Sequence, residues 1–272
     1  MYGKSLRLSR IMNVDTGRTC IVPMDHGVTL GPIDGIRDYA GTITQVVSGG
    51  ADALVLHKGL LKSVTSHSQL SKGRYIMHLS ASTSLSNDSN HKVLTGSVEE
   101  AVKLGADGVS VHINLGVWSE GEMIKDFGMV ARDCMEWGMP LLAMIYTHKN
   151  PEDINAVMHS ARVAEELGAD IVKVGYPGSI ENTEKLIRGV GIPIVIAGGA
   201  RMESVEKLMH TIDDALNAGA SGVAIGRNIF QYKNPGLITG LISKLVHGKL
   251  KLGQCLSMLE ELEGVYAEGC RL

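Results

Sequence analysis

The feature that most constrains the fold of this chain is a short motif that occurs four times. Its copies are Gly50-Ala-Asp-Ala-Leu54, Gly105-Ala-Asp-Gly-Val109, Gly168-Ala-Asp-Ile-Val172 and Gly219-Ala-Ser-Gly-Val223. Each copy follows an amphipathic stretch and leads into an apolar run, so its glycine suits the left-handed position just past a helix. The motif therefore predicts that one helix–loop–strand unit is repeated along the whole chain.

Eight short runs rich in Val, Ile and Leu are the predicted strands. They are residues 20–24, 53–57, 75–79, 108–114, 141–146, 171–174, 192–197 and 222–225. Most of the runs lack polar alternation, which is typical of parallel strands that are buried on both faces. With short loops and no linker, they predict an α/β fold: a single (β/α)8 TIM barrel. A doubly wound open sheet is the alternative.

The barrel is expected to occupy residues 1–272 as one domain, because a chain of this length can bury a single large core. Segments 1–18 and 249–272 are extensions that we expect to cover the barrel ends or to form an oligomer contact. Ser97-Val-Glu-Glu100 and Ser119-Glu-Gly-Glu122 have the capping-box pattern of helix starts. Asn150-Pro151 predicts another helix start, with Asn as N-cap and Pro at the first helical position.

Composition excludes several classes of protein. The formal net charge is −3, from 26 basic and 29 acidic residues, whereas nucleic-acid-binding proteins usually carry a basic excess. No apolar run approaches the roughly 20 residues that span a bilayer, and the first ten residues do not resemble a signal peptide. The four cysteines lack metal-ligand spacing, so we expect free thiols in a cytoplasmic protein.

Chemistry in such a barrel is expected where the strands end, because the loops after them carry the site. Lys173 is the sharpest candidate, since it interrupts the apolar run Ile171-Val172-Lys173-Val174. Desolvation there favours the neutral amine, which can attack a carbonyl carbon and form a Schiff base. The alternative is a lysine paired with a carboxylate or a phosphate inside the barrel.

Three further candidates follow other strands. Asp25 comes directly after the first strand, where a carboxylate could move protons at a reacting carbon or could cap its own loop. His26, next to it, is expected to orient this loop or to contact the substrate. Tyr146 ends the fifth strand, so its hydroxyl could approach the Lys173 amine or could anchor the barrel rim.

His57, His78 and His112 raise the question of a metal site. They lie on different strands and form neither a His-x-His nor a His-Glu-x-x-His motif. We therefore expect no catalytic metal.

Glycines follow the last two strands, in Gly198-Gly199-Ala200-Arg201 and Gly226-Arg227-Asn228. These loops often bind phosphate in (β/α)8 barrels, because glycine lets backbone amides approach the oxygens and a short helix begins there. Gly198, Gly199, Gly226 and Arg227 are therefore the predicted phosphate site, unless both loops are only tight turns.

The sequence resembles the class I aldolases of archaeal type. The resemblance runs from about residue 4 to about residue 247 and rests on Pro23-Met-Asp-His-Gly27, Leu56-His-Lys-Gly59, Ile145-Tyr146, Val172-Lys-Val174, Ala197-Gly-Gly199 and Gly226-Arg-Asn-Ile-Phe230. Within the family, 2-amino-3,7-dideoxy-D-threo-hept-6-ulosonate synthases are the most similar, through His78-Leu-Ser80, Gly108-Val-Ser-Val-His112 and Glu136-Trp-Gly-Met-Pro140. Archaeal fructose-bisphosphate aldolases are slightly less similar.

The resemblance implies specific roles. Lys173 matches the Schiff-base lysine, Tyr146 the acid/base tyrosine and Asp25 the aspartate that moves a proton at the reacting carbon. Gly199, Gly226 and Arg227 match the phosphate site. It also implies a phosphorylated sugar substrate, no cofactor beyond the lysine itself, and a homo-oligomer that binds neither nucleic acid nor membrane.

The sequence departs from the family pattern after the tyrosine. The family usually continues with Pro-Arg-Gly, whereas Thr147-His148-Lys149 follows here, and Met144 stands where fructose-bisphosphate aldolases tend to carry an aromatic residue. The first difference leaves the identity of donor and acceptor open, and Met144 favours a synthase that adds a keto-sugar unit to L-aspartate semialdehyde. Lys58, Lys149 and Arg201 are candidates for binding the carboxylate of this acceptor, and a solvated surface charge is the alternative for each. A fructose-bisphosphate aldolase, a flavin or nucleotide enzyme, and a catalytically silent sugar-phosphate-binding barrel are the alternatives.

Overall fold

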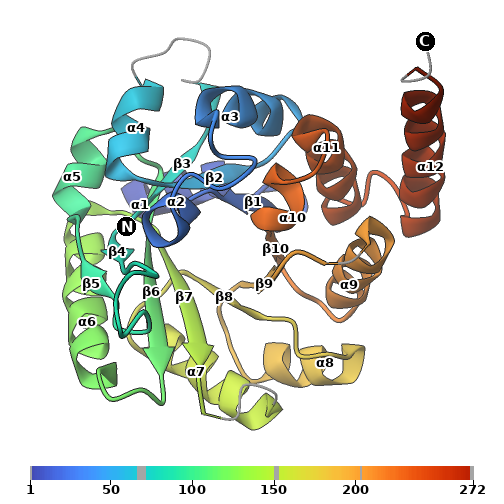
Figure 1. Cartoon of the computed structure of the whole chain (residues 1–272). Helices are drawn as coiled ribbons and strands as arrows, with labels where there is room; N and C mark the ends of the chain where they lie inside the picture. Colours follow the sequence, from blue (N-terminus) through green and yellow to red (C-terminus); the bar gives the residue numbers. More distant parts are fainter. Residues whose placement is uncertain (1, 66–71, 150–152, 203, 270–272) are drawn as a thin grey trace.

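The computed structural model describes residues 2–65, 72–149, 153–202 and 204–269, and it contains a closed eight-stranded parallel barrel. This confirms the fold class. The barrel strands are β1 (Thr19–Pro23), β2 (Ala53–His57), β3 (Tyr75–His78), β6 (Gly108–Leu115), β7 (Leu141–Thr147), β8 (Ile171–Gly175), β9 (Ile194–Ala197) and β10 (Gly222–Ala224). Their order around the barrel is β1-β10-β9-β8-β7-β6-β3-β2 (Figure 1). β1 closes the barrel by pairing with both β2 and β10.

Helices alternate with the strands and form the outer layer (Figure 1). They are α2 (His26–Leu30), α3 (Tyr39–Ser48), α4 (Lys58–Thr65), α5 (Val98–Lys103), α6 (Glu120–Trp137), α7 (Ile154–Glu166), α8 (Ile180–Arg188), α9 (Val205–Asn217), α10 (Arg227–Phe230) and α11 (Pro235–Val246). Two more lie outside the repeat, α1 (Tyr2–Ile11) and α12 (Leu252–Gly269). None of the described helices is both long and apolar enough to cross a membrane.

The repeated Gly-Ala-Asp motif fixes how neighbouring strands begin. Its glycines have positive φ in all four copies, between 74° and 103°, as the left-handed turn requires. In the first copy the Asp52 amide donates to the Cys20 carbonyl, and the Asp52 carboxylate accepts from the Cys20 amide. Asp107 makes the same pair of bonds to Tyr75, and Asp170 to Leu141. Each aspartate therefore ties one strand to the start of its neighbour.

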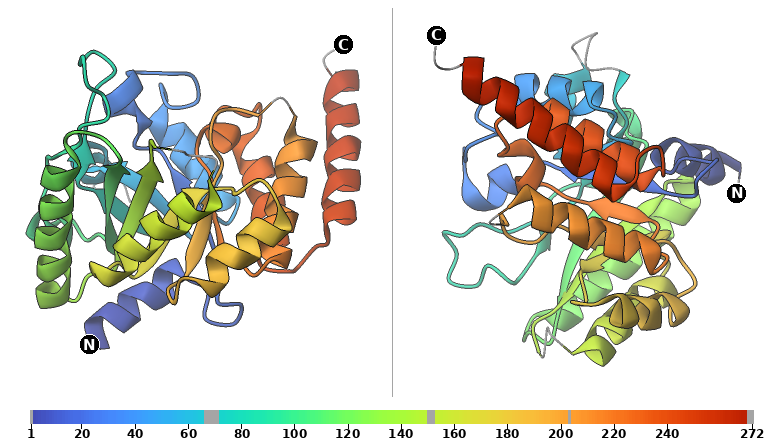
Figure 2. Two further views of the ribbon diagram at one scale, coloured as in Figure 1. Left: turned by 90° about the horizontal axis from the view of Figure 1, so that it is seen from below. Right: turned by 90° about the vertical axis from the view of Figure 1, so that its right-hand side faces the viewer.

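The N-terminal helix closes the end of the barrel where the strands begin (Figure 2, left). Lys4 pairs with Asp170 at 2.8 Å and Arg10 with Asp107 at 3.1 Å, so α1 holds two of the motif aspartates. Ile11 packs into the barrel interior with inward-facing side chains such as Ile21, Ile171 and Val195. This end of the barrel is thus sealed, which leaves the opposite end for a site.

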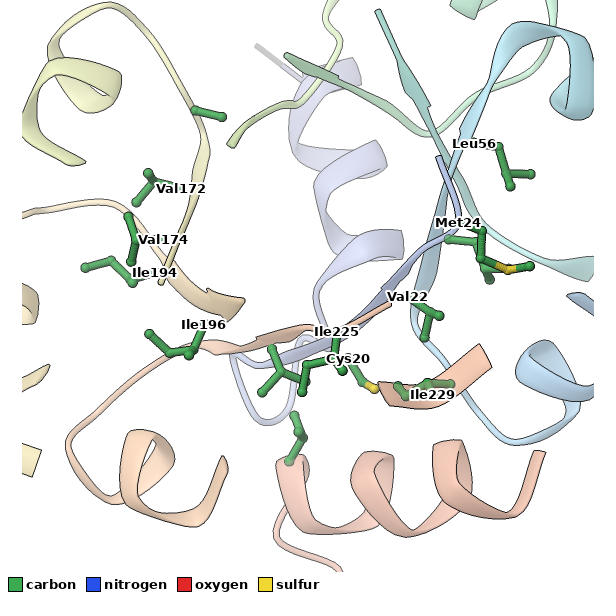
Figure 3. Close-up of a cluster of buried hydrophobic side chains, with 14 of the residues drawn as sticks. Cys20, Val22, Met24, Leu56, Val172, Val174, Ile194, Ile196, Ile225 and Ile229 are labelled. Atoms are coloured by element: carbon green, nitrogen blue, oxygen red, sulfur yellow. The ribbon is translucent and has the colours of Figure 1, made fainter. Parts of the chain in front are cut away.

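A second core lies between the barrel wall and the helices. Cys20 and Val22 of β1 belong to it (Figure 3). Ile21 between them belongs to the cluster inside the barrel, as strand alternation requires. Cys20, Cys134 and Cys255 are buried free thiols. Strands buried on both faces explain why the apolar runs of the sequence show no polar alternation.

The predicted helix starts have different outcomes. Ser97 and Glu100 form the expected capping box. The helix start at Ser119 is confirmed, because α6 begins at Glu120 with Ser119 as its N-cap, but the capping box is not: the Ser119 hydroxyl makes no cap bond and is buried without a partner among the described residues. Asn150-Pro151 lies outside the described residues, and α7 begins at Ile154 with the Asp153 carboxylate as its cap.

One element was not predicted. The segment between β3 and α5 forms an antiparallel hairpin of β4 (Ser80–Ala81) and β5 (Val93–Leu94). It lies at the opposite end of the barrel from α1 (Figure 2, left).

Candidate active site

A cavity of about 440 Å³ opens at the end of the barrel where the strands finish. All eight residues predicted for the site line it: Asp25, His26, Tyr146, Lys173, Gly198, Gly199, Gly226 and Arg227. They come from β1, β7, β8, β9 and β10 or the loops after them, so distant parts of the sequence meet here. The cavity is therefore the candidate active site.

Lys173 lies near the centre of this arrangement, in the middle of β8. Its residue is only 9% exposed, and in register it stands beside Met144 of β7 on one side and Val195 of β9 on the other. Met144 and Val195 both belong to the apolar barrel interior. The lysine stem therefore crosses an apolar layer before its amine reaches the cavity.

Tyr146 lies on the neighbouring strand, two residues beyond Met144. Its ring packs against the imidazole of His112 on β6, with centroids 5.1 Å apart. Burial, followed by the charges of Lys92, His78 and Lys173, lowers the pKa of His112 to about 3, so the ring is neutral at pH 7. The neutral ring holds one face of the tyrosine without adding charge to the cavity.

Asn114 orients that histidine. Its amide nitrogen donates to the Asn90 carbonyl at 2.7 Å, which leaves its side-chain oxygen as an acceptor. That oxygen lies 2.9 Å from His112 Nε2 and 3.1 Å from His148 Nε2, so both rings donate from Nε2. His148 belongs to the unusual loop of residues 147–149, and its bond to Asn114 directs it toward β6. No residue of this loop lines the cavity.

Asp25 is surrounded by histidines and lysine. His78 Nε2 lies 3.7 Å from one carboxylate oxygen and His26 Nδ1 lies 3.8 Å from the other. Burial by itself would raise the pKa of Asp25, but His78, His26, Lys173 and His57 together outweigh it and hold the pKa well below its usual range. Asp25 is therefore a carboxylate at neutral pH, within electrostatic reach of Lys173.

The loops after β9 and β10 form the other end of the cavity. A Cβ atom on Gly226 would lie 2.6 Å from the Pro23 carbonyl oxygen and 2.7 Å from a His26 ring carbon, so only glycine fits. Gly199 has a φ of 63° with open space beside it. The Arg227 guanidinium donates to the Gly199 carbonyl, and its Nε is buried with no partner among the described residues.

Asn228 is a structural residue at this end of the cavity, and no role was predicted for it. Its side-chain amide donates to the carbonyls of Gly198 and Ala200, and its oxygen accepts from the Met202 amide at 2.7 Å. Three bonds from one side chain thus fix the loop after β9. In the sequence, the position of Asn228 in the Gly226-Arg-Asn228 motif was the only indication that it belongs to this site.

Lys92 is the charged residue of the cavity lining that the sequence analysis missed. It precedes β5, and it lines the cavity together with His112, Tyr146 and Lys173. The cations considered instead, Lys58, Lys149 and Arg201, do not line it. Lys58 is exposed and pairs with Glu100 at 3.0 Å, which fits the alternative interpretation of Lys58 as a solvated surface charge.

His57, His78 and His112 do not gather as metal ligands. The ring of His78 stacks edge-on against His57, 5.2 Å between centroids, and its Nδ1 bonds to Ser110 at 2.8 Å. Within the described part of the chain, no group of three or more His, Cys, Asp or Glu side chains is placed to hold a metal ion.

The barrel and its lysine-containing cavity fit a (β/α)8 aldolase, and comparison with known proteins shows that class. Residues 19–232 match the model of the DeoC/LacD family of aldolases, and the chain belongs to this family. It is a class I aldolase.

Named relatives extend over nearly the whole chain. A 2-amino-3,7-dideoxy-D-threo-hept-6-ulosonate synthase from Halobacterium salinarum is 43% identical over 90% of this chain and 92% of that protein. A 2-amino-4,5-dihydroxy-6-oxo-7-(phosphonooxy)heptanoate synthase from Streptomyces griseus is 40% identical over 90% and 91%. An archaeal fructose-1,6-bisphosphate aldolase, solved with its catalytic lysine covalently bound to the carbinolamine intermediate, is 28% identical, with a TM-score of 0.82 and coverage of 90% and 100%.

Proposed function

We propose that this aldolase forms a Schiff base between Lys173 and a phosphorylated keto-sugar, and that it joins the resulting three-carbon unit to L-aspartate semialdehyde. The observation that carries the proposal is the shared cavity: a buried lysine amine, a tyrosine, a carboxylate and a glycine-lined loop pair all face one space. These are the groups that an iminium mechanism requires.

The phosphate of the substrate is proposed to lie between the loops after β9 and β10. Gly199 has open space beside it, Gly198 and Gly226 line the same part of the cavity, and the Arg227 Nε, which has no partner among the described residues, supplies a buried donor. Binding the phosphate there would hold the carbonyl carbon near Lys173 and would use remote binding energy to position the reacting atoms.

The chemical steps follow from these positions. The Lys173 nitrogen attacks the donor carbonyl, and loss of water gives an iminium. With a keto-sugar donor, the positive nitrogen draws electrons, so the adjacent carbon–carbon bond breaks and its electron pair forms an enamine, while the hydroxyl on the leaving carbon gives its proton to Asp25 or Tyr146. With dihydroxyacetone phosphate as donor, Asp25 or Tyr146 instead takes a proton from the hydroxymethyl carbon beside the iminium, and the electron pair of that C–H bond forms the enamine. The enamine carbon then attacks the acceptor aldehyde, whose oxygen takes a proton back. Water finally releases the product and the free amine.

Asp25 has a second proposed role in these steps. Its carboxylate stays ionised at neutral pH and lies within electrostatic reach of Lys173, so it opposes the positive charge that persists in the iminium. No added cofactor is needed in this scheme, since the lysine nitrogen itself accepts the electrons.

The acceptor is proposed from the relatives' names. Both names describe seven-carbon 2-amino acids with a keto group at carbon 6, which in an aldol product places the new bond between carbons 4 and 5. Carbons 1–4 are then 2-amino-4-oxobutanoate, which is aspartate semialdehyde. The donor supplies carbons 5–7, either from dihydroxyacetone phosphate or from 6-deoxy-5-ketofructose 1-phosphate.

A competition assay tests this function. The enzyme is given either donor together with equal concentrations of L-aspartate semialdehyde and glyceraldehyde 3-phosphate, and the products are identified by mass. We expect the seven-carbon amino acid to dominate. Preference for glyceraldehyde 3-phosphate would replace the proposal with fructose-bisphosphate aldolase activity, which the 28% identical archaeal structure makes the second candidate.

A further inference from the structure

We propose that Lys92, on the hairpin that projects over the barrel mouth, is the specificity-determining residue that binds the carboxylate of the acceptor aldehyde. This inference deepens the proposed function and depends on it. According to this inference, the Lys92 side chain determines the preference of the enzyme for an acidic over a neutral acceptor aldehyde.

Charge in the cavity is the first argument. The described lining residues include three cationic side chains, Lys92, Lys173 and Arg227, against one carboxylate, Asp25. His26 and His112 add no charge at pH 7, because burial lowers the pKa of each ring. Arg227 belongs to the proposed phosphate site and Lys173 is the proposed nucleophile, so Lys92 is the basic side chain of the described lining that has no part in binding or activating the donor.

The position of Lys92 is the second argument. Around the barrel the order is β10, β9, β8, β7, β6 and β3. The phosphate loops follow β10 and β9, Lys173 is on β8, Tyr146 is on β7, and the hairpin packs over β6 through the Ser80 hydroxyl and the His112 amide, 2.8 Å apart. Lys92 and the phosphate loops therefore flank Lys173 from opposite sides, as the two ends of a substrate would require.

The state of the ammonium is the third argument. Lys92 is half-buried, and its nitrogen donates to the Ser82 hydroxyl and to the Ser89 carbonyl. An ammonium has three protons, so these two bonds leave one for another acceptor. No carboxylate of the described residues lies within ion-pair distance of it, and burial lowers its pKa even though Asp25 and Asp88 act against this.

The hairpin around Lys92 is held in place. Asn114 binds the Asn90 carbonyl, Trp118 donates to the Asp88 carboxylate at 2.7 Å, and His91 lies 3.0 Å from Glu122. A lysine anchored on both sides is preorganised, which reduces the entropy lost when an anion binds. An ordinary solvated surface lysine would lack these supports.

The test compares two acceptors of equal length, L-aspartate semialdehyde and butanal, with dihydroxyacetone phosphate as donor. In Lys92→Met we expect KM for the semialdehyde to rise about 10- to 100-fold, while kcat/KM for butanal changes less than about twofold. Lys92→Arg should retain most of the preference. Lys58→Met, which removes a cation outside the cavity, should behave as the wild type.

Two further measurements separate the possible failures. Ser82→Ala removes a hydrogen bond of the hairpin but keeps the Lys92 ammonium, so this variant should keep the preference for the acidic acceptor. Equal losses of activity with both acceptors in Lys92→Met would mean that Lys92 has a structural role, and would overturn the inference. A wild-type enzyme without preference for the acidic aldehyde would overturn it as well. Borohydride trapping of the donor is measured in parallel, since a missing adduct in the wild type would instead reject the proposed Schiff-base function.

Discussion

The guanidinium of Arg227 lies 2.9 Å from the carbonyl oxygen of Gly199 and joins the two glycine loops at one end of the cavity. One terminal nitrogen of Arg227 thus donates to the backbone of the loop after β9, while the buried Nε has no partner among the described residues. This division suits a side chain that orders its own loop and also binds an anion.

Replacing Arg227 should therefore act mainly through the phosphate. In Arg227→Met we expect KM for dihydroxyacetone phosphate to rise about 30-fold or more, because a charge-assisted contact in a partly buried site is lost. With unphosphorylated dihydroxyacetone the change should stay below about threefold. Steady-state kinetics with both donors makes the comparison. Arg201→Met, in the adjacent loop but outside the cavity, is the control, and equal losses for both donors would contradict a phosphate role.

Gly226 should not tolerate a methyl group. Gly226→Ala places Cβ against the Pro23 carbonyl and the His26 ring, so the end of β1 and Asp25 must shift. We expect a loss of about 1–3 kcal/mol in the free energy of unfolding and a larger relative loss of activity. Urea denaturation measures the first quantity. Gly121→Ala is the matched substitution, since its Cβ meets nothing within 4 Å in α6, and it should stabilise the protein by about 0.5–1 kcal/mol.

Stability should fall in mild acid because of the buried histidines. The folded pKa is lowered to about 4 for His78 and about 3 for His112, mainly by burial. Unfolded histidine has a pKa of about 6.5, so below this pH the unfolded chain binds protons that the folded chain does not. The contribution of each ring is therefore complete above about pH 6.5 and is lost as the pH falls toward the folded value.

His112→Gln isolates one of these rings. Between pH 6.5 and pH 4.5 its loss of stability should be smaller than that of the wild type by about 2 kcal/mol. Urea titrations at the two pH values provide the measurement. The exposed His159 is the control, and His159→Gln should keep the full pH dependence of the wild type. An unchanged dependence in His112→Gln would show that this ring is not neutral in the folded protein.

Activity should survive chelation. In the proposed mechanism the lysine nitrogen withdraws the electrons that a divalent ion withdraws in metal-dependent aldolases. Dialysis against EDTA should therefore leave kcat within about twofold. Loss of turnover that zinc restores would contradict the mechanism.

The barrel could be predicted because its signals are local and repeated. The glycine of each Gly-Ala-Asp motif needs a left-handed backbone, and the doubly buried strands need continuous apolar runs, so both appear directly in the sequence. The pairing of each motif aspartate with the preceding strand was not predicted, because it depends on which strands become neighbours. Ser119 shows the limit of a local pattern: the capping-box spacing is present, but the hydroxyl is buried in the fold.

The candidate site could be predicted for a similar reason and with a similar limit. Residues at the ends of barrel strands must converge, so Asp25, Tyr146 and Lys173 could be placed together. Lys92 could not, because its place over the mouth depends on contacts with Asn114 and Ser82 across a hairpin without strong strand patterning. The homo-oligomer and the cytoplasmic location remain predictions.

The central claim is that the Lys173 amine is the nucleophile, and covalent trapping tests it most directly. The protein is incubated with dihydroxyacetone phosphate and borohydride, digested, and mapped by mass spectrometry. We expect one stable adduct, on the peptide that contains Lys173, and none in Lys173→Met, where methionine fills similar apolar space and should preserve the fold. An adduct on Lys58, Lys92 or Lys149, or an undiminished adduct in Lys173→Met, would contradict the account.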